Sequence, residues 1–145
     1  MIEAMMITSL IVSIPPPKTQ VTDRFLTALA MVEYGGKGQA PDGDNGLAVG
    51  PFQIHRIYRR QANICLRGPV FNDDDRNSFR ASKEMARVVL KHFEKYHRDR
   101  GIKITPAVLC SFHRLPSIHW KPERMNSVLE RGRTKRLLAY MKGVK

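Results

Sequence analysis

The first strong pattern in the chain is a run of apolar positions at helical spacing, over residues 21–32. Spacings of three and four residues place such side chains on one face of a helix. Thr19 or Thr22 can cap its amino end, and two glycines directly after the run supply a stop. The sequence therefore predicts a helix that carries Glu33 in its last turn.

Later segments show the same periodicity. Helices are predicted at 55–63, at 73–100 before a stop at Gly101, at 105–114 before Leu115-Pro116, and from Pro122 through Met141. Aspartates 73–75 suit the amino end of the longest helix, because the helix dipole favours negative charge there. The apolar stripes expected to face the core are Phe79, Met85, Ala86, Val89, Leu90, Phe93 and Tyr96 in the longest helix, and Val128, Leu129, Leu137, Leu138 and Met141 in the last.

The pattern changes between the first two predicted helices. A glycine-rich loop runs to Gly46, and the short apolar segment 47–54 contains Pro51, which is typical of a turn or strand fragment. β-Alternation is nearly absent elsewhere. The prediction is a mainly α, single domain over 19–145, with a small β-turn element after the first helix. Residues 1–18 form an extension that resembles a weak signal segment, but Glu3 and no basic residue precedes its apolar run, and no small-x-small cleavage site follows it.

Charge narrows the choice of partner. The chain carries 25 Lys and Arg against 13 Asp and Glu, a net charge of +12, and residues 121–145 contribute half of it. Such an excess favours a polyanionic partner: nucleic acid, an acidic membrane surface or an anionic cell-wall polymer. No apolar run reaches the roughly 20 residues that span a bilayer.

The two cysteines leave the redox compartment open. Cys65 and Cys110 either form one long-range disulfide or remain buried thiols, and their spacing matches no metal-binding pattern. No His, Cys and Asp arrangement predicts a metal site, and no cofactor is expected.

Glu33 is the first candidate for chemistry. The carboxyl end of a helix and the neighbouring Val32 both favour a protonated carboxyl group, as a general acid requires. Asp42 and Asp44 follow on the glycine-rich loop, and two carboxyl groups across a cleft are what glycoside hydrolysis needs. Taken alone, Glu33 fits a solvated last-turn residue better than a catalytic one, and the aspartates fit ordinary turns. The loop fits neither an EF-hand nor a P-loop, because the residues required at the later positions are missing.

Two motifs carry a resemblance to a known family. "ALAMVEYGG" followed by "GDNGLAVGPFQIHRIY" resembles the signature of the lysozyme-like superfamily, closest to invertebrate-type lysozymes and to bacterial transglycosylase-related domains. In that pattern a helix ends in Glu-Ser-Gly, a short loop contains Asp, and Gly-x-x-Gln-Ile follows with an aromatic residue. "NDDDRNSFRASKEMARVVLKHF" also resembles the long central helix of the bacterial members, so the likeness covers about residues 22–93.

The resemblance implies an α+β lysozyme-like fold and cleavage of the β-1,4 bond between N-acetylmuramic acid and N-acetylglucosamine in peptidoglycan. Glu33 falls on the catalytic glutamate and is expected to protonate the glycosidic oxygen. Asp44 matches the second carboxylate, with Asp42 in reserve. The implied partner is peptidoglycan, acted on by a monomer outside the cell, in the periplasm or at the cell wall.

Four further residues are expected to contact substrate. Gln53 matches the Gly-x-x-Gln-Ile turn, as a buried strut or as a contact to the N-acetyl group, and Tyr58 matches the aromatic residue. Tyr34 replaces the family's small residue after the glutamate and is expected to reshape the cleft. His113, in a segment that departs from the family's Trp-Asn-Gly-Gly-Pro pattern, either lines the cleft or packs a helix junction.

Three other functions remain open at this level, one of them a degenerate lysozyme-like fold that serves as a wall-binding or inhibitor-like module. A lytic transglycosylase uses one glutamate and releases an anhydro product, which fits Glu33 without Asp44. A basic nucleic-acid-binding protein fits the charge and the basic last helix but leaves the order of the two motifs unexplained.

Overall fold

The computed structural model describes residues 15, 17–35, 40, 42–114 and 116–143. Five α-helices account for most of this part of the chain: α1 (Asp23–Tyr34), α2 (Arg56–Cys65), α3 (Phe79–Arg98), α4 (Pro106–Arg114) and α5 (Val128–Lys142). Three 3₁₀ turns lie between them: η1 (Asp44–Gly46), η2 (Asp74–Asn77) and η3 (Pro122–Asn126). The predicted mainly helical single domain is confirmed.

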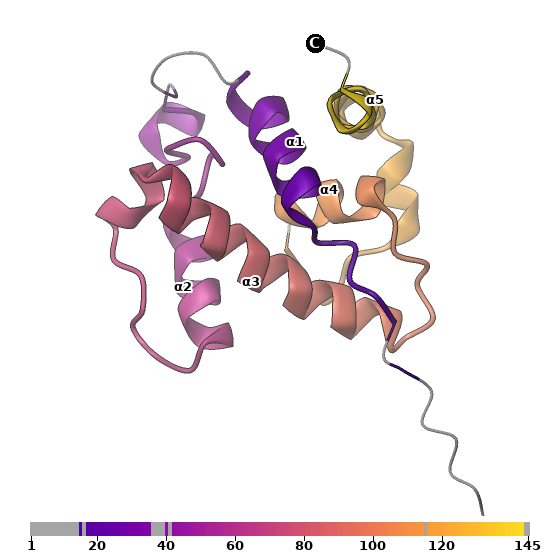
Figure 1. Cartoon of the computed structure of the whole chain (residues 1–145), viewed down its shortest axis with the longest axis horizontal. Helices are drawn as coiled ribbons and strands as arrows, with labels where there is room; N and C mark the ends of the chain where they lie inside the picture. Colours follow the sequence, from indigo (N-terminus) through magenta and orange to yellow (C-terminus); the bar gives the residue numbers. More distant parts are fainter. Residues whose placement is uncertain (1–14, 16, 36–39, 41, 115, 144–145) are drawn as a thin grey trace, which may run out of the picture.

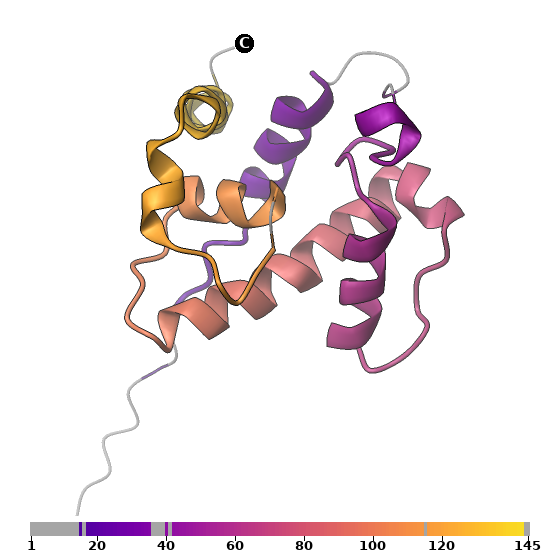
Figure 2. The same cartoon turned by 180° about the vertical axis from the view of Figure 1, so that it is seen from behind.

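The longest helix, α3, organises the others. Figures 1 and 2 show α3 crossing the molecule. Helix α2 lies on one side of its N-terminal part, and α1, α4 and α5 lie on the opposite side. Contacts join α2 to α3, α1 to α5, and α4 to both α3 and α5. The core gathers apolar side chains from these helices and from the loop before α2, with Phe25, Phe52, Phe112, Met85 and Leu109 among its fully buried members. No helix in the described part of the chain is long and apolar enough to cross a membrane.

The first helix forms as the sequence predicts. The Thr22 hydroxyl accepts a hydrogen bond from the backbone N–H of Phe25 at 3.1 Å and caps α1. Gly35 ends the helix with φ of 79°, a left-handed conformation that glycine adopts without steric cost. These two caps place Glu33 in the last turn of α1.

The start of the longest helix differs from the prediction. Ser78, and not the aspartates at 73–75, caps α3, and the aspartates belong instead to the turn around η2. Asp73 forms ion pairs with Arg56, Arg59 and Arg76, which provide more positive charge than a helix end does. Phe79, the first residue of α3, is 44% exposed, so the buried apolar stripe begins later than expected.

The last helix also differs. Pro122 opens the turn η3, and α5 begins only at Val128, after the cap Ser127. Of the predicted apolar stripe, Leu137 and Met141 pack in or against the core, whereas Val128, Leu129 and Leu138 are exposed, at 78%, 50% and 41%. The buried residues of α5 are Glu130, Arg133 and Leu137, spaced three and four apart. Charged side chains occupy this face because α1 and α4 present charged partners to it.

The loop between α1 and α2 contains two isolated antiparallel bridges, Gly43 with Ala48 and Val49 with Ile54. Gly50 turns the chain between them with φ of 74°, and a Cβ atom there would lie 1.9 Å from the Arg76 carbonyl oxygen. The buried Arg76 guanidinium donates to the carbonyl oxygens of Leu47 at 3.2 Å and Ile54 at 2.9 Å. This loop is therefore fixed to η2 by close packing and by a buried arginine.

Both cysteines are free thiols. Cys110 is buried in α4, and Cys65 is half-buried at the end of α2. The signal-like segment 1–14 lies outside the described residues.

Candidate functional site

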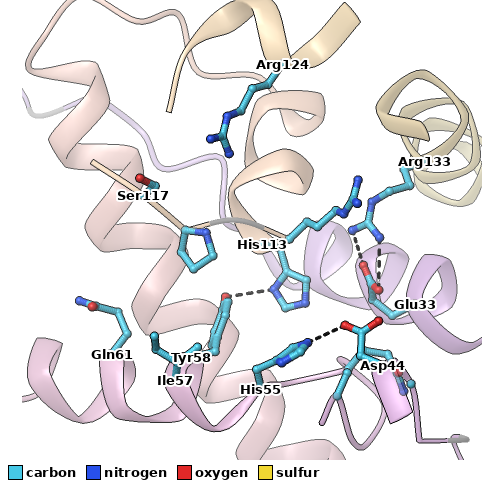
Figure 3. Close-up of a pocket in the computed structure, with 15 residues that line it drawn as sticks. Glu33, Asp44, His55, Ile57, Tyr58, Gln61, His113, Ser117, Arg124 and Arg133 are labelled. Carbon is cyan, nitrogen blue, oxygen red and sulfur yellow. Dashed lines mark hydrogen bonds and ion pairs between the residues drawn. The ribbon is translucent and has the colours of Figure 1, made fainter. Parts of the chain in front are cut away.

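A cavity of about 780 Å³ opens between the carboxyl end of α1, the bridged loop, α2, α4 and the η3–α5 segment. Five of the six predicted site residues line it: Glu33, Asp44, Gln53, Tyr58 and His113. The sixth, Tyr34, is not among its lining residues and packs against the hydrophobic core. Residues 80 positions apart in sequence thus share one pocket (Figure 3).

Glu33 is held by an arginine that the sequence analysis did not single out. Arg133 Nη1 donates to Glu33 Oε2 at 3.4 Å, and Nη2 makes a closer bond to Oε1. Both side chains are about 10% exposed. A two-pronged guanidinium–carboxylate contact with so little solvent stabilises the charged carboxylate strongly. It opposes the local effects of the helix end and of Val32, which were expected to favour the protonated form.

Arg133 belongs to a larger charged cluster at the junction of α1, α4 and α5. Its Nη2 lies 3.9 Å from Cys110 Sγ, and Glu130, one turn earlier in α5, pairs with Arg114 Nη1 at 3.2 Å. Burial works to lower the pKa of Arg133, but the negative charges of Glu33, of the Cys110 thiolate that forms at high pH and of Glu130 outweigh it and raise that pKa. Burial raises the pKa of Cys110 to about 11, so its thiol is neutral at pH 7.

His113 and Tyr58 form a buried hydrogen-bonded pair in the wall of the cavity. His113 Nε2 lies 2.8 Å from the Phe52 carbonyl oxygen, which only accepts, so Nε2 carries the proton. Burial lowers the pKa of His113, and the ring is therefore neutral with Nδ1 free to accept the Tyr58 hydroxyl at 3.0 Å. Burial and the Glu33 charge raise the pKa of Tyr58 well above 10, so it stays a donor.

The second carboxylate lies at the exposed edge of the cavity. Asp44 occupies the left-handed region with φ of 48° in η1, and its side chain is 69% exposed. His55 Nε2 lies 2.8 Å from Asp44 Oδ2, and both residues line the cavity (Figure 3). Asp42 is exposed and is not a lining residue. Of the two aspartates considered from sequence, the cavity contains Asp44.

Gln53 braces the bridged loop. Its backbone is left-handed, with φ of 48°, and its side-chain Nε2 donates to the Gly50 carbonyl oxygen at 3.0 Å. A Cβ atom on Gly43 would lie 2.4 Å from Gln53 Oε1, so the Gln53 amide packs closely on the first bridge and would have to shift for any larger residue there. Gln53 is thus a strut that also faces the cavity, which keeps both predicted roles open.

Several lining residues were missed from sequence: Arg133, Arg114, Arg124, Ser117 and His55. Arg133 resembles its exposed neighbours in a basic helix, and the packing of α5 shows that it faces inward. A weak signal did exist, because Arg133 lies four residues before the apolar Leu137 on the same helix face. Among the described residues, no group of three or more His, Cys, Asp or Glu side chains is arranged to hold a metal ion.

Comparisons with known proteins give no match to a family model, to a curated protein or to a solved structure. The likeness to the lysozyme-like superfamily therefore rests on the motifs within residues 22–93, and the function rests on the chemistry of the cavity.

Proposed function

We propose that this protein is a lysozyme-like muramidase, which hydrolyses the β-1,4 bond between N-acetylmuramic acid and N-acetylglucosamine in peptidoglycan. The observation that carries the proposal is the presence of Glu33 and Asp44 in one cavity of about 780 Å³, at the positions where the family motif has its two carboxylates. A cavity of this size is in the range of ligand pockets, roughly 300–1,000 Å³. The α+β lysozyme-like fold, with the two bridges as a minimal β element, is part of this proposal.

In the proposed reaction, Glu33 donates a proton to the glycosidic oxygen as the bond breaks. Arg133 occupies both carboxylate oxygens of Glu33, so the side chain must loosen its bond to Arg133 before it can act on the glycosidic oxygen. Asp44 faces the developing positive charge at the anomeric carbon, either as a nucleophile or as an electrostatic partner. The Asp44 side chain is 69% exposed and that of Glu33 about 10%, so the two carboxyl groups lie in different surroundings, as two different roles require.

The remaining lining residues suit a sugar substrate. Gln53, Ser117 and Gln61 offer amide and hydroxyl groups for hydroxyl and N-acetyl substituents. The neutral His113–Tyr58 pair gives the cavity a fixed, weakly polar wall. The net charge of +12 raises the rate of encounter with a polyanionic cell wall.

One observation favours a second candidate, a lytic transglycosylase that uses Glu33 alone. Asp44 Oδ2 is engaged by His55 at 2.8 Å, so Asp44 must leave that bond to face a sugar. In a transglycosylase the glutamate acts first as an acid and then as a base, and the muramic acid's own hydroxyl closes a 1,6-anhydro ring without water.

Digestion of purified peptidoglycan, followed by mass spectrometry of the soluble products, tests both candidates. Hydrolysis gives muramic acid ends with one added water, and transglycosylation gives anhydro ends that are lighter by that water. Products with unbroken glycan chains, or none at all, contradict the proposal. Tight binding of DNA without any glycan cleavage identifies a basic nucleic-acid-binding protein instead.

A further inference from the structure

Three arginines face the candidate cavity, against two carboxylates. Arg133 is bound to Glu33 and Arg114 to Glu130, whereas Arg124 forms no ion pair with any residue that the structure describes. Figure 3 shows Arg124 extending from η3 on the side of the cavity opposite Asp44 and His55. The cavity thus has an acidic side and a basic side, and on the basic side the Arg124 guanidinium has no carboxylate partner among the described residues.

A basic wall of this kind suits an anionic group of the ligand. The planar guanidinium presents paired N–H donors that match the two oxygens of a carboxylate, and burial strengthens the contact. Arg133 already makes such a contact with Glu33, at a place where the two side chains are about 10% exposed. A second carboxylate entering the cavity therefore competes with Glu33 for the same guanidinium.

We propose that the basic wall formed by Arg114, Arg124 and Arg133 binds an acidic substituent of the glycan, and that this substituent takes Arg133 away from Glu33. The inference rests on the proposed function, because it assigns Glu33 the role of proton donor. Arg133 is then a positioning residue: it stores Glu33 as a carboxylate and releases it when an acidic sugar occupies the wall. The released carboxylate takes one proton from solvent, and the arginine keeps its charge and exchanges one carboxylate partner for another.

The surroundings of Glu33 make the exchange effective. The groups that face it are Arg133 from α5, Cys110 and His113 from α4, and Tyr58 from α2. Burial keeps Cys110, His113 and Tyr58 neutral at pH 7, through a raised pKa for the thiol and the phenol and a lowered pKa for the imidazole. Arg133 is therefore the one cation among these four groups. Once it turns to the ligand, little else offsets the cost of a charged carboxylate in a nearly closed site.

The inference predicts selectivity for acidic glycans. N-Acetylmuramic acid differs from N-acetylglucosamine by a lactyl ether that carries a carboxylate. The carboxylate of N-acetylmuramic acid pairs with the basic wall and frees Glu33, whereas N-acetylglucosamine leaves the Glu33–Arg133 pair intact. A neutral polymer of N-acetylglucosamine is then bound weakly and left uncleaved, although its glycosidic bond has the same chemistry.

The test uses the two monosaccharides as probes, so that binding is measured without cleavage. Titrations followed by NMR are expected to show that N-acetylmuramic acid binds at least about tenfold more tightly than N-acetylglucosamine. Arg124→Gln is expected to abolish the preference, and Arg136→Gln, a change at an exposed arginine of α5, to leave it unchanged. The side-chain carboxyl ¹³C signal of Glu33 is expected to shift with N-acetylmuramic acid only, because only that sugar displaces Arg133 from the Glu33 carboxylate.

A second variant serves as the control for loss of folding. Arg133→Lys retains the positive charge and is expected to keep the preference in part, whereas Arg133→Gln is expected to remove both the preference and the response of the Glu33 signal. If both variants unfold, Arg124→Gln alone decides, because Arg124 is exposed and makes no ion pair that the described structure depends on.

The outcomes separate this inference from the proposed function. Equal binding of the two sugars, or a preference that survives Arg124→Gln, overturns the inference even if the protein cleaves peptidoglycan. A carboxylate-dependent preference that moves the Glu33 signal supports it even if no cleavage is detected, in which case the muramidase proposal fails and the anion site stands.

Discussion

Arg133 binds both carboxylate oxygens of Glu33, although the two residues lie 100 positions apart in sequence. The contact joins the last turn of α1 to the second turn of α5 and closes one side of the cavity. It gives the proposed proton donor a charged partner at a site where both side chains are about 10% exposed. The same contact therefore serves stability and sets the condition under which Glu33 can act.

The buried pair makes a direct prediction for stability. Arg133→Met leaves the Glu33 carboxylate without a partner, and removing one member of a buried ion pair costs about 3–5 kcal/mol. We expect urea unfolding to show a loss of this order at pH 7. The double variant Glu33→Gln with Arg133→Met is expected to recover much of it, since no unpaired charge remains. A single variant as stable as the wild type would show that the pair contributes nothing to folding.

The packing of the bridged loop predicts that alanine substitutions at two glycines have different effects on the free energy of unfolding. Gly50→Ala places a Cβ atom 1.9 Å from the Arg76 carbonyl oxygen and strains a backbone with φ of 74°. We expect the free energy of unfolding to fall by about 1–3 kcal/mol or more. Gly68→Ala is the matched control, because a Cβ atom there has no neighbour within 4 Å. Equal stability of the two variants in urea would contradict the close packing of the loop on η2.

His113 predicts a pH dependence. Its pKa in the folded protein is lowered from 6.5 by burial, so below pH 6.5 the unfolded chain binds a proton that the folded protein refuses. The free energy of unfolding therefore decreases as the pH falls from 6.5 toward the lowered pKa, by up to about 1.4 kcal/mol per pH unit. His113→Gln is expected to remove this part of the slope, and His92→Gln, at an exposed site, to leave it. Identical slopes for the wild type and His113→Gln between pH 5 and 6.5 would exclude a buried neutral imidazole.

Replacing each of the two aspartates of the loop is expected to affect peptidoglycan hydrolysis differently. Asp44 lines the cavity and Asp42 does not, so Asp44→Asn is expected to slow peptidoglycan hydrolysis by about 10²-fold or more, and Asp42→Asn to have little effect. Release of soluble glycan by the purified variants measures both. Unchanged hydrolysis by Asp44→Asn points to a mechanism with one carboxylate, and a loss confined to Asp42→Asn reverses the assignment.

Local signals in the sequence account for much of the fold. The spacing of apolar residues before Glu33, with Thr22 and the following glycine as caps, predicts α1 correctly. Where several polar residues compete for one role, local reasoning selects the wrong one: Ser78 caps α3, while Asp73 binds arginines of α2 and η2.

The site is predictable only in part, for a physical reason. Glu33, Asp44 and Gln53 lie within 21 positions of one another, and a short sequence motif identifies them as candidate site residues. Arg133 joins them through the packing of α5, whose buried face carries Glu130 and Arg133 in place of the expected apolar side chains. Tyr34, one position from Glu33, turns toward the core because successive residues of a helix point in different directions.

The central claim is that Glu33 is the proton donor of a peptidoglycan-cleaving site. The most direct measurement is the rate at which a peptidoglycan suspension loses turbidity with the wild type, Glu33→Gln, Glu33→Asp and the exposed-site control Glu84→Gln, each first shown to be folded by circular dichroism. We predict clearing by the wild type and the control, and rates at least about a hundredfold lower for both Glu33 variants. Glu33→Asp keeps a negative charge beside Arg133, so its loss of activity cannot be assigned to an unpaired arginine. Clearing by Glu33→Gln at the wild-type rate would contradict the account.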